Sequence, residues 1–168
     1  MKDNIQINVT IFHYITRNFS NNCHRKLSRT SNKNCVFILI VDSKISNNII
    51  QSGWGIHLRS GSSKMKIMQN EISSSSIGIF LQDVYLNHAL NNQISTGLQG
   101  ILIGNGSESN LVNANKVFEV QYSGITLEGN NYNNHINGNS VTCQICSECL
   151  IVDAVSELFL SNDISGNH

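Results

Sequence analysis

The sequence predicts an all-β solenoid, because two short patterns recur along the chain at a nearly constant spacing. The first is an apolar residue, two variable residues, asparagine, any residue and an apolar residue, as in Ile67–Ile72. The second is glycine, isoleucine, any residue and an aliphatic residue, as in Gly78–Leu81. Both alternate apolar with variable positions, which is strand periodicity. Units this small cannot bury their own apolar side, so they must stack on one another.

The asparagine of the first pattern recurs six times, at steps of 22, 22, 23, 24 and 23 residues. These asparagines are Asn48, Asn70, Asn92, Asn115, Asn139 and Asn162. Asparagine tolerates left-handed backbone angles and bonds to nearby backbone at a sharp corner, and stacked amides can bond along the stack. We therefore expect an asparagine ladder along one corner of the solenoid.

The glycine of the second pattern suits another corner, where positive φ or a close backbone approach is needed. It occurs as Gly55, Gly78, Gly100 and Gly124. Stacking these copies in register places two apolar columns inside the solenoid. The first predicted column is Ile56, Ile79, Ile101, Ile125 and Leu150, and the second is Leu58, Leu81, Ile103, Leu127 and Val152.

The repeats divide the chain into two parts. Residues 1–34 hold one alternating strand, Ile5–Ile11, and a polar, basic loop at 21–34, which together predict a cap or an irregular coil. The loop is either a solvated insertion, which we favour, or a small anion-binding patch. Residues 35–168 predict about five to six coils of 22–25 residues. The pattern stops just after Asn162 with no capping segment, so we expect end-to-end self-association or a longer parent chain.

Composition narrows the class of partner. The chain has 168 residues, 11 Lys plus Arg and 11 Asp plus Glu, and this neutral balance argues against nucleic acid or an acidic membrane surface as a partner. No apolar run is long enough to span a bilayer, and the N-terminus lacks a signal-peptide core. The five cysteines cannot all pair within the chain. The sequence predicts no cofactor.

At this point the chain resembles the right-handed parallel β-helix repeat family, over roughly residues 35–168. That family includes pectate lyases, alginate epimerases, phage tailspikes, archaeal surface proteins and the periplasmic β-helix protein of nitrous-oxide reductase maturation. The resemblance implies a carbohydrate-associated protein that is extracellular or on the cell surface. It concerns the fold rather than the activity, because the repeated residues are structural.

The strand alternation points a third column outward, and such a column is the usual ligand face of these folds. It comprises His57, Phe80, Leu102, Thr126 and Ile151. Aromatic and polar groups near it are candidate saccharide contacts, since sugars stack on rings and bond to polar side chains. The candidates are Trp54, His57, Arg59, Phe80, Gln82 and Tyr122. The plainer interpretation is that Trp54 and Tyr122 pack at a corner and that His57 is a surface histidine.

Glu128 and Asp153 are the weak candidates for catalysis. They fall on adjacent coils, and paired carboxylates bind calcium or perform acid/base work on a glycosidic bond. The alternative is two solvated charges at strand ends. His57 and Arg59 lie three coils away, so the four residues do not form one site. The catalytic motifs of polygalacturonase-like enzymes, alginate epimerases and pectate lyases are not evident.

A cysteine cluster is the candidate metal site. Three thiolates, from Cys143, Cys146 and Cys149, could bind zinc, copper(I) or a metal cluster, and His135 could be the fourth ligand of a zinc site. The alternative is that these cysteines are small apolar residues at inward or corner positions.

Three functions follow from these observations, in order of preference. The first is a non-catalytic module that binds polysaccharide or is displayed against it. The second is part of a polysaccharide lyase, glycoside hydrolase or uronan epimerase. The third, which only the cysteine cluster and one branch of the resembling family favour, is a scaffold in periplasmic metal-site maturation.

Overall fold

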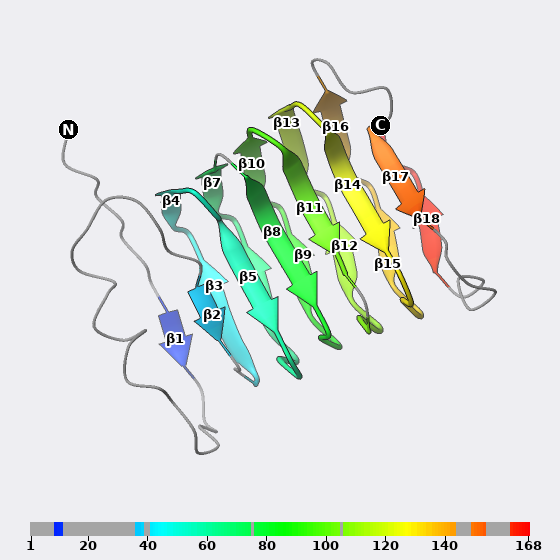
Figure 1. Cartoon of the computed structure of the whole chain (residues 1–168). Coiled ribbons are helices and arrows are strands. Elements are labelled where there is room, and N and C mark those ends of the chain that lie inside the picture. The colour runs from blue at the N-terminus through cyan, green and yellow to red at the C-terminus, as the bar shows by residue number, and fades with distance from the viewer. Residues whose placement is uncertain are drawn as a thin grey trace.

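The computed structural model of the chain describes residues 9–11, 36–38, 41–74, 76–104, 106–143, 149–153 and 162–168. All regular elements in these ranges are β-strands, which lie in three sheets that run along one solenoid (Figure 1). Within the same ranges, no helix is long and apolar enough to cross a membrane.

Each sheet takes one strand from every turn. Sheet A contains β4 (Ile49–Ser52), β7 (Glu71–Ser74), β10 (Gln93–Thr96), β13 (Lys116–Val120) and β16 (Ser140–Cys143). Sheet B contains β1 (Val9–Ile11), β3 (Ser43–Ser46), β6 (Lys66–Met68), β9 (His88–Leu90), β12 (Leu111–Asn113), β15 (His135–Asn137) and β18 (Asp163–Ser165). Sheet C contains β2 (Val36–Ile38), β5 (Ile56–Arg59), β8 (Ile77–Gln82), β11 (Gln99–Ile103), β14 (Ser123–Glu128) and β17 (Leu150–Asp153).

The sheets form a parallel β-solenoid, because each strand pairs with its equivalent one turn later. About four turns are complete, from β3–β5 to β12–β14, with further strands at both ends, so the predicted five to six coils is a slight overcount. At the N-terminal end, β1 covers part of the predicted strand Ile5–Ile11 and pairs antiparallel with β3. The predicted loop at 21–34 lies outside the described residues.

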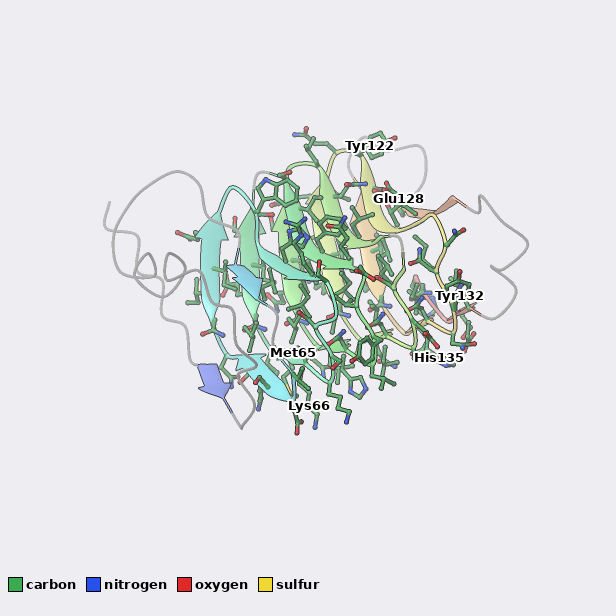
Figure 2. The ribbon with its side chains drawn as sticks, turned by 60° about the horizontal axis from the view of Figure 1, so that its bottom comes forward. Met65, Lys66, Tyr122, Glu128, Tyr132 and His135 are labelled. Atoms are coloured by element: carbon green, nitrogen blue, oxygen red, sulfur yellow. The ribbon has the colours of Figure 1, made fainter. Side chains whose placement is uncertain are left out.

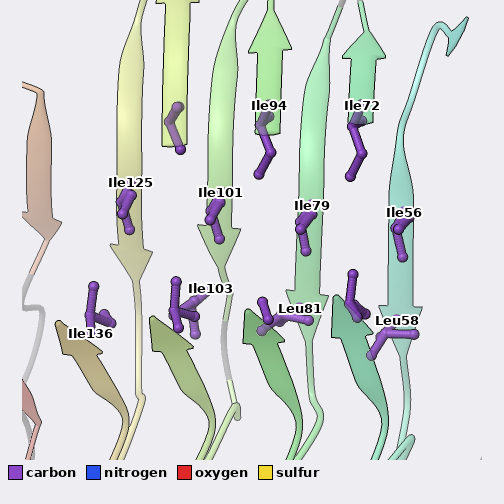
Figure 3. Packing of buried hydrophobic residues seen from close by; sticks show 14 of the residues in the cluster. Ile56, Leu58, Ile72, Ile79, Leu81, Ile94, Ile101, Ile103, Ile125 and Ile136 are labelled. Carbon is purple, nitrogen blue, oxygen red and sulfur yellow. The ribbon is translucent and has the colours of Figure 1, made fainter. Parts of the chain in front are cut away.

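The core consists of the predicted apolar columns. The residues of each column pair directly from strand to strand. The first column is Ile56, Ile79, Ile101, Ile125 and Leu150, and the second is Leu58, Leu81, Ile103, Leu127 and Val152. Ile79 and Ile101 are completely buried (Figure 3). Sheet A closes the core from the opposite side with the Ile72 and Ile94 column. The alternation of apolar and variable residues in the sequence therefore corresponds to inward and outward side chains.

The predicted asparagine ladder is present at the corner between sheets B and A. In each copy, the backbone N–H and the side-chain Nδ2 both donate to Oδ1 of the asparagine one turn later, at 2.9–3.1 Å. After Asn48, whose other Nδ2 proton bonds to Ser46 O of its own turn, the remaining Nδ2 proton bonds to a carbonyl of the preceding turn, as from Asn92 to Ile67 O. The ladder runs through Asn48, Asn70, Asn92, Asn115, Asn139 and Asn167.

The last rung corrects the sequence analysis, which had assigned it to Asn162. Asn162 instead belongs to a second ladder, at the corner that leads into sheet B, and it accepts from Asn134. This second ladder comprises Asn87, Asn110, Asn134 and Asn162. The final step from Asn139 to Asn167 is 28 residues, so counting forward by the usual period reached the asparagine of the wrong corner. The pairing of Ile136 with Ile164 fixes the true register.

Three of the four motif glycines, Gly55, Gly100 and Gly124, are required by close backbone approach. A Cβ at Gly100 would lie 2.2 Å from Val117 Cγ1 and 2.4 Å from the carbonyl oxygen of Gly124. One at Gly55 would lie 2.0 Å from the carbonyl oxygen of Gly78. These distances are far below contact, so a side chain here would separate two adjacent turns. The glycine therefore lets sheet A turn into sheet C without opening the stack.

We predict that Asn92→Ala lowers the free energy of unfolding by about 3 kcal/mol, because it removes the side chain from the middle of the ladder and leaves buried backbone groups unpaired. The control is Gln93→Ala, on the next residue, whose exposed side chain should contribute less than about 0.5 kcal/mol. Urea unfolding followed by circular dichroism measures both. Equal, small losses in the two variants would contradict a stabilising ladder.

Candidate functional site

The outer face of sheet C carries the predicted ligand column, but much of that column is not accessible. Its residues are paired in register from strand to strand, as expected: they are His57, Phe80, Leu102, Thr126 and Ile151. However, His57 is only 4% exposed, Leu102 5% and Thr126 2%. The prediction that His57 is a surface histidine is therefore wrong. Alternation tells which way a side chain points, but it does not tell whether neighbouring side chains cover it.

Three aromatic rings gather at the N-terminal end of this face. The His57 ring stacks on Phe80 at a centroid distance of 4.3 Å and on Trp54 at 5.9 Å, with interplanar angles of 19° and 18°. Trp54 and Phe80 are 6.3 Å apart and tilted by 35°. Because the Trp54–Phe80 distance of 6.3 Å is much shorter than the two stacking distances added together, the three centroids form a triangle and no ring is sandwiched between the other two. Trp54 and Phe80 stay partly exposed while His57 is buried, so these two rings form one accessible aromatic surface.

Burial controls the protonation of His57. The pKa of its imidazole is lowered from 6.5 to about 4, mainly because burial desolvates the ring and to a smaller extent because of the nearby positive charge of Arg59. A contact with Gln82, whose Oε1 lies 3.3 Å from His57 Nε2, acts in the opposite direction. The ring is therefore neutral at physiological pH. A base of this pKa binds protons poorly, so His57 is better suited to packing than to proton abstraction.

Arg59 and Gln82 form the polar margin of the aromatic surface. They are paired on adjacent strands, β5 and β8, at the end of sheet C nearest the turn into sheet B. Arg59 is exposed and Gln82 is partly buried. Both side chains project on the same face as the rings, since each lies two residues beyond a ring of its own strand. The site therefore combines aromatic area with a cationic group and an amide.

Gly104 completes the surface, a role that sequence reasoning missed. It lies one turn after Gln82, and a Cβ there would be 3.0 Å from Phe80 Cε2. The missing side chain leaves room for the Phe80 ring to extend over the next turn. The signal in the sequence was that glycine stands at Gly104 where the other turns have Arg59, Gln82 and Glu128.

Tyr122 does not belong to this cluster. It is 63% exposed at the corner before β14, and its backbone N–H donates to Leu98 O on the preceding turn. Strand β14 lies three strands along sheet C from β5, roughly 14 Å away at strand spacing. Figure 2 shows Tyr122 at the upper margin of the solenoid, close to the C-terminal turns. The structure therefore brings together five of the six predicted ligand contacts.

The candidate carboxylates are neighbours of each other but not of the aromatic cluster. Glu128 and Asp153 are paired in register on β14 and β17, as predicted. Glu128 is exposed, and the Asp153 side chain lies outside the part that is described. Because β14 is three strands from β5, neither carboxylate converges with His57 and Arg59.

The cysteine cluster is only partly described. Cys143 is half-buried and disulfide-bonded, and Cys149 is free and half-buried. Cys146 lies outside the described residues. A disulfide-bonded Cys143 offers no thiolate, so the metal hypothesis stays a prediction that applies to the reduced cysteine. Among the residues that the structure describes, no group of three His, Cys, Asp or Glu side chains could hold a metal ion.

His135, the suggested fourth ligand, has a different neighbour. It is exposed on β15, and its Nδ1 lies 3.7 Å from Asp163 Oδ2 on β18. These two residues pair across sheet B, so a protonated His135 would form an ion pair with the next turn.

The arrangement of strands, ladders and glycine corners defines a parallel β-helix with an aromatic surface on one face. Comparison with family models gives the same class: residues 4–141 match the model described as the right-handed β-helix region. This match covers most of the chain, so the chain belongs to the right-handed β-helix family. No curated protein and no solved structure matches it.

We predict that His57 makes the stability of the fold depend on pH. Its folded pKa of about 4 is below 6.5, so on acidification the unfolded chain takes up a proton before the folded chain does. The contribution of neutral His57 to the free energy of unfolding is fully present above pH 6.5. It decreases by roughly 1–3 kcal/mol as the pH falls toward 4. Urea unfolding at pH 7 and pH 4.5 measures it for the wild type and for His57→Phe, in which the loss should be smaller.

The matched control is His135→Gln, which changes an exposed histidine on sheet B. This variant should keep the pH dependence that is due to His57. Identical pH dependence in the wild type and in His57→Phe would show that the ring is solvated, contrary to the structure. The midpoint of the His57 ring signals in an NMR titration provides a second, direct measurement, expected near pH 4.

Proposed function

We propose that the chain is a non-catalytic, carbohydrate-binding β-helix module that contacts polysaccharide through the Trp54 and Phe80 surface. The observation that carries this proposal is the partly exposed pair of rings beside Gln82 and Arg59. A pyranose ring presents a face of C–H bonds, which packs on aromatic rings, and a rim of hydroxyl groups, which bond to polar side chains. The surface offers both kinds of contact within two adjacent turns.

The rigidity of the site supports a binding role. Trp54 and Phe80 both rest on the buried His57 ring, and Phe80 also extends over Gly104. Side chains held by packing lose little conformational entropy when a ligand binds, so more of the contact energy is retained as affinity. The parallel sheet beneath them fixes the spacing of the turns, and a polymer could follow the same axis. From the family resemblance, we propose that the module lies outside the cell or on its surface.

The distribution of acidic groups favours binding over catalysis. Hydrolysis of a glycosidic bond calls for two carboxyl groups on opposite sides of the bond. The paired residues Glu128 and Asp153 belong to adjacent strands of one sheet, β14 and β17, which lie three and four strands from β5 and two and three strands from β8. A sugar that is held on Trp54 would therefore leave its nearest glycosidic bonds out of reach of both groups.

Native electrophoresis through gels cast with neutral and acidic polysaccharides tests the proposal. We expect the wild type to be retarded by at least one polymer, which is left intact. Trp54→Ala should weaken the apparent affinity roughly tenfold or more, which corresponds to about 1.4 kcal/mol, because it removes half of the aromatic surface. Retardation that is unchanged in Trp54→Ala would exclude this surface as the binding site.

The control is Tyr122→Ala, which removes an exposed aromatic side chain from a different part of the solenoid. It should be retarded like the wild type. A loss in both variants would indicate nonspecific adhesion of aromatic groups. A cleared zone at the protein band would contradict the non-catalytic assignment, and Glu128 and Asp153 would then be the first residues to substitute.

A further inference from the structure

The charges of the chain are balanced overall but strongly separated along the sequence. Ten of the 11 Lys and Arg residues fall within residues 1–66, and nine of the 11 Asp and Glu residues fall within 67–168. The first segment therefore carries a formal charge of +8 and the second one of −8. Since the strands stack in sequence order, the described part of the solenoid is basic toward its N-terminal turns and acidic toward its C-terminal turns.

The outer face of sheet B carries this separation in one straight column. Pairing between strands aligns Lys44 with Lys66, Lys66 with His88, His88 with Leu111, Leu111 with His135, and His135 with Asp163. The residues that follow them in each strand point inward and are buried or partly buried, so this column points outward. We call it the sheet B strip. Figure 2 shows Lys66 and His135 on the lower side of the solenoid, with His135 nearer the C-terminal turns.

The two ends of the sheet B strip are complementary to each other. Lys44 and Lys66 are like charges on paired strands about 4.8 Å apart, an unfavourable arrangement, and neither forms an ion pair with a described carboxylate. Asp163, at the other end, is exposed. The centre consists of His88 and Leu111, which are partly exposed. The strip therefore runs from two lysines through a weakly polar centre to His135 and the negative Asp163, whose side chains lie 3.7 Å apart.

We propose that this face binds a second copy of the chain in an antiparallel, side-by-side dimer. The two-fold axis lies in the plane of the interface, perpendicular to the strip, and crosses it between His88 and Leu111. The strips of the two copies therefore face each other and run in opposite directions. The axis places Lys44 opposite Asp163 of the second copy, and Asp163 opposite Lys44 of the second copy. Such self-complementary two-fold contacts are the commonest form of homodimer, because one favourable contact is made twice.

The neighbouring corner supports the same arrangement. A second aligned column lies beside the strip and comprises Val41, Ser63, Tyr85, Glu108 and Tyr132. The same axis places Tyr85 opposite Glu108 of the second copy, where a phenol can donate to a carboxylate. Tyr85 and Leu86 are exposed apolar side chains at the level of His88, close to the axis. Burial of these two side chains adds apolar contact at the centre of a charged interface.

The size of the face indicates a weak dimer. The six strands of the strip are separated by five intervals of about 4.8 Å, so the strip is roughly 24 Å long, and a three-residue strand is about 10 Å long. The flat area of the strip is therefore about 240 Å², well below the roughly 800 Å² per partner that is typical of stable complexes. We therefore expect association at micromolar or higher concentration. It should weaken as salt rises, since charge pairs at the rim are screened. The dimer leaves sheet C free and is independent of the carbohydrate surface.

Sedimentation velocity over a range of protein and salt concentrations tests the proposal. The wild type should form a dimer and no larger species, and high salt should weaken it. Lys44→Glu and Asp163→Lys should each weaken association at least tenfold, because each creates two like-charge contacts. An equimolar mixture of the two variants should restore the dimer, since both contacts then join opposite charges. Circular dichroism confirms that both variants are folded.

The control is Lys116→Glu, which reverses an exposed lysine on sheet A. This variant should dimerise like the wild type. A wild type that is monomeric at all concentrations would overturn the proposal, as would a mixture of the two variants that stays monomeric. A series of species growing with concentration would also overturn it, because that pattern indicates end-to-end stacking.

Discussion

The fold depends on the hydrogen bonds that asparagine side chains make from one turn to the next. A sharp corner inside a stack leaves backbone groups buried without strand partners, and each unpaired group costs about 1–3 kcal/mol. In both ladders, Oδ1 accepts from the preceding turn while Nδ2 donates onward. The ladders therefore satisfy the corners and fix the register of adjacent turns. The apolar columns can then stack without a slip of one residue, which would turn them outward.

Register in turn determines which residues meet on the surface. Trp54 and His57 come from one turn and Phe80 from the next, and only the alignment of β5 with β8 makes them one cluster. The same rule applies to sheet B, where residues more than 100 positions apart in sequence become two ends of one charged column. Surface properties of this solenoid are therefore properties of columns, and a single turn carries only part of each.

Much of the fold could be predicted from the sequence, because a repeated local pattern encodes it. The glycine corners and the inward columns follow directly from periodicity. The position of Asn162 could not be found in this way, since the longer step before Asn167 breaks the period, and both corners use asparagine. The burial of His57 was also missed, because it depends on neighbouring rings from two turns. The charge separation was visible in the sequence, but overall neutrality concealed it until the turns were placed in order.

Hydrogen exchange of the asparagine side-chain amides, followed by NMR, tests the ladder account most directly. The account predicts slow exchange for the Nδ2 protons of buried rungs of both ladders, such as Asn92 and Asn110, whose two donors are occupied. It predicts fast exchange for Asn91, which is exposed at the corner next to Asn92. Similar, fast exchange at all three residues would contradict the account, because the turns would then be held without the ladders.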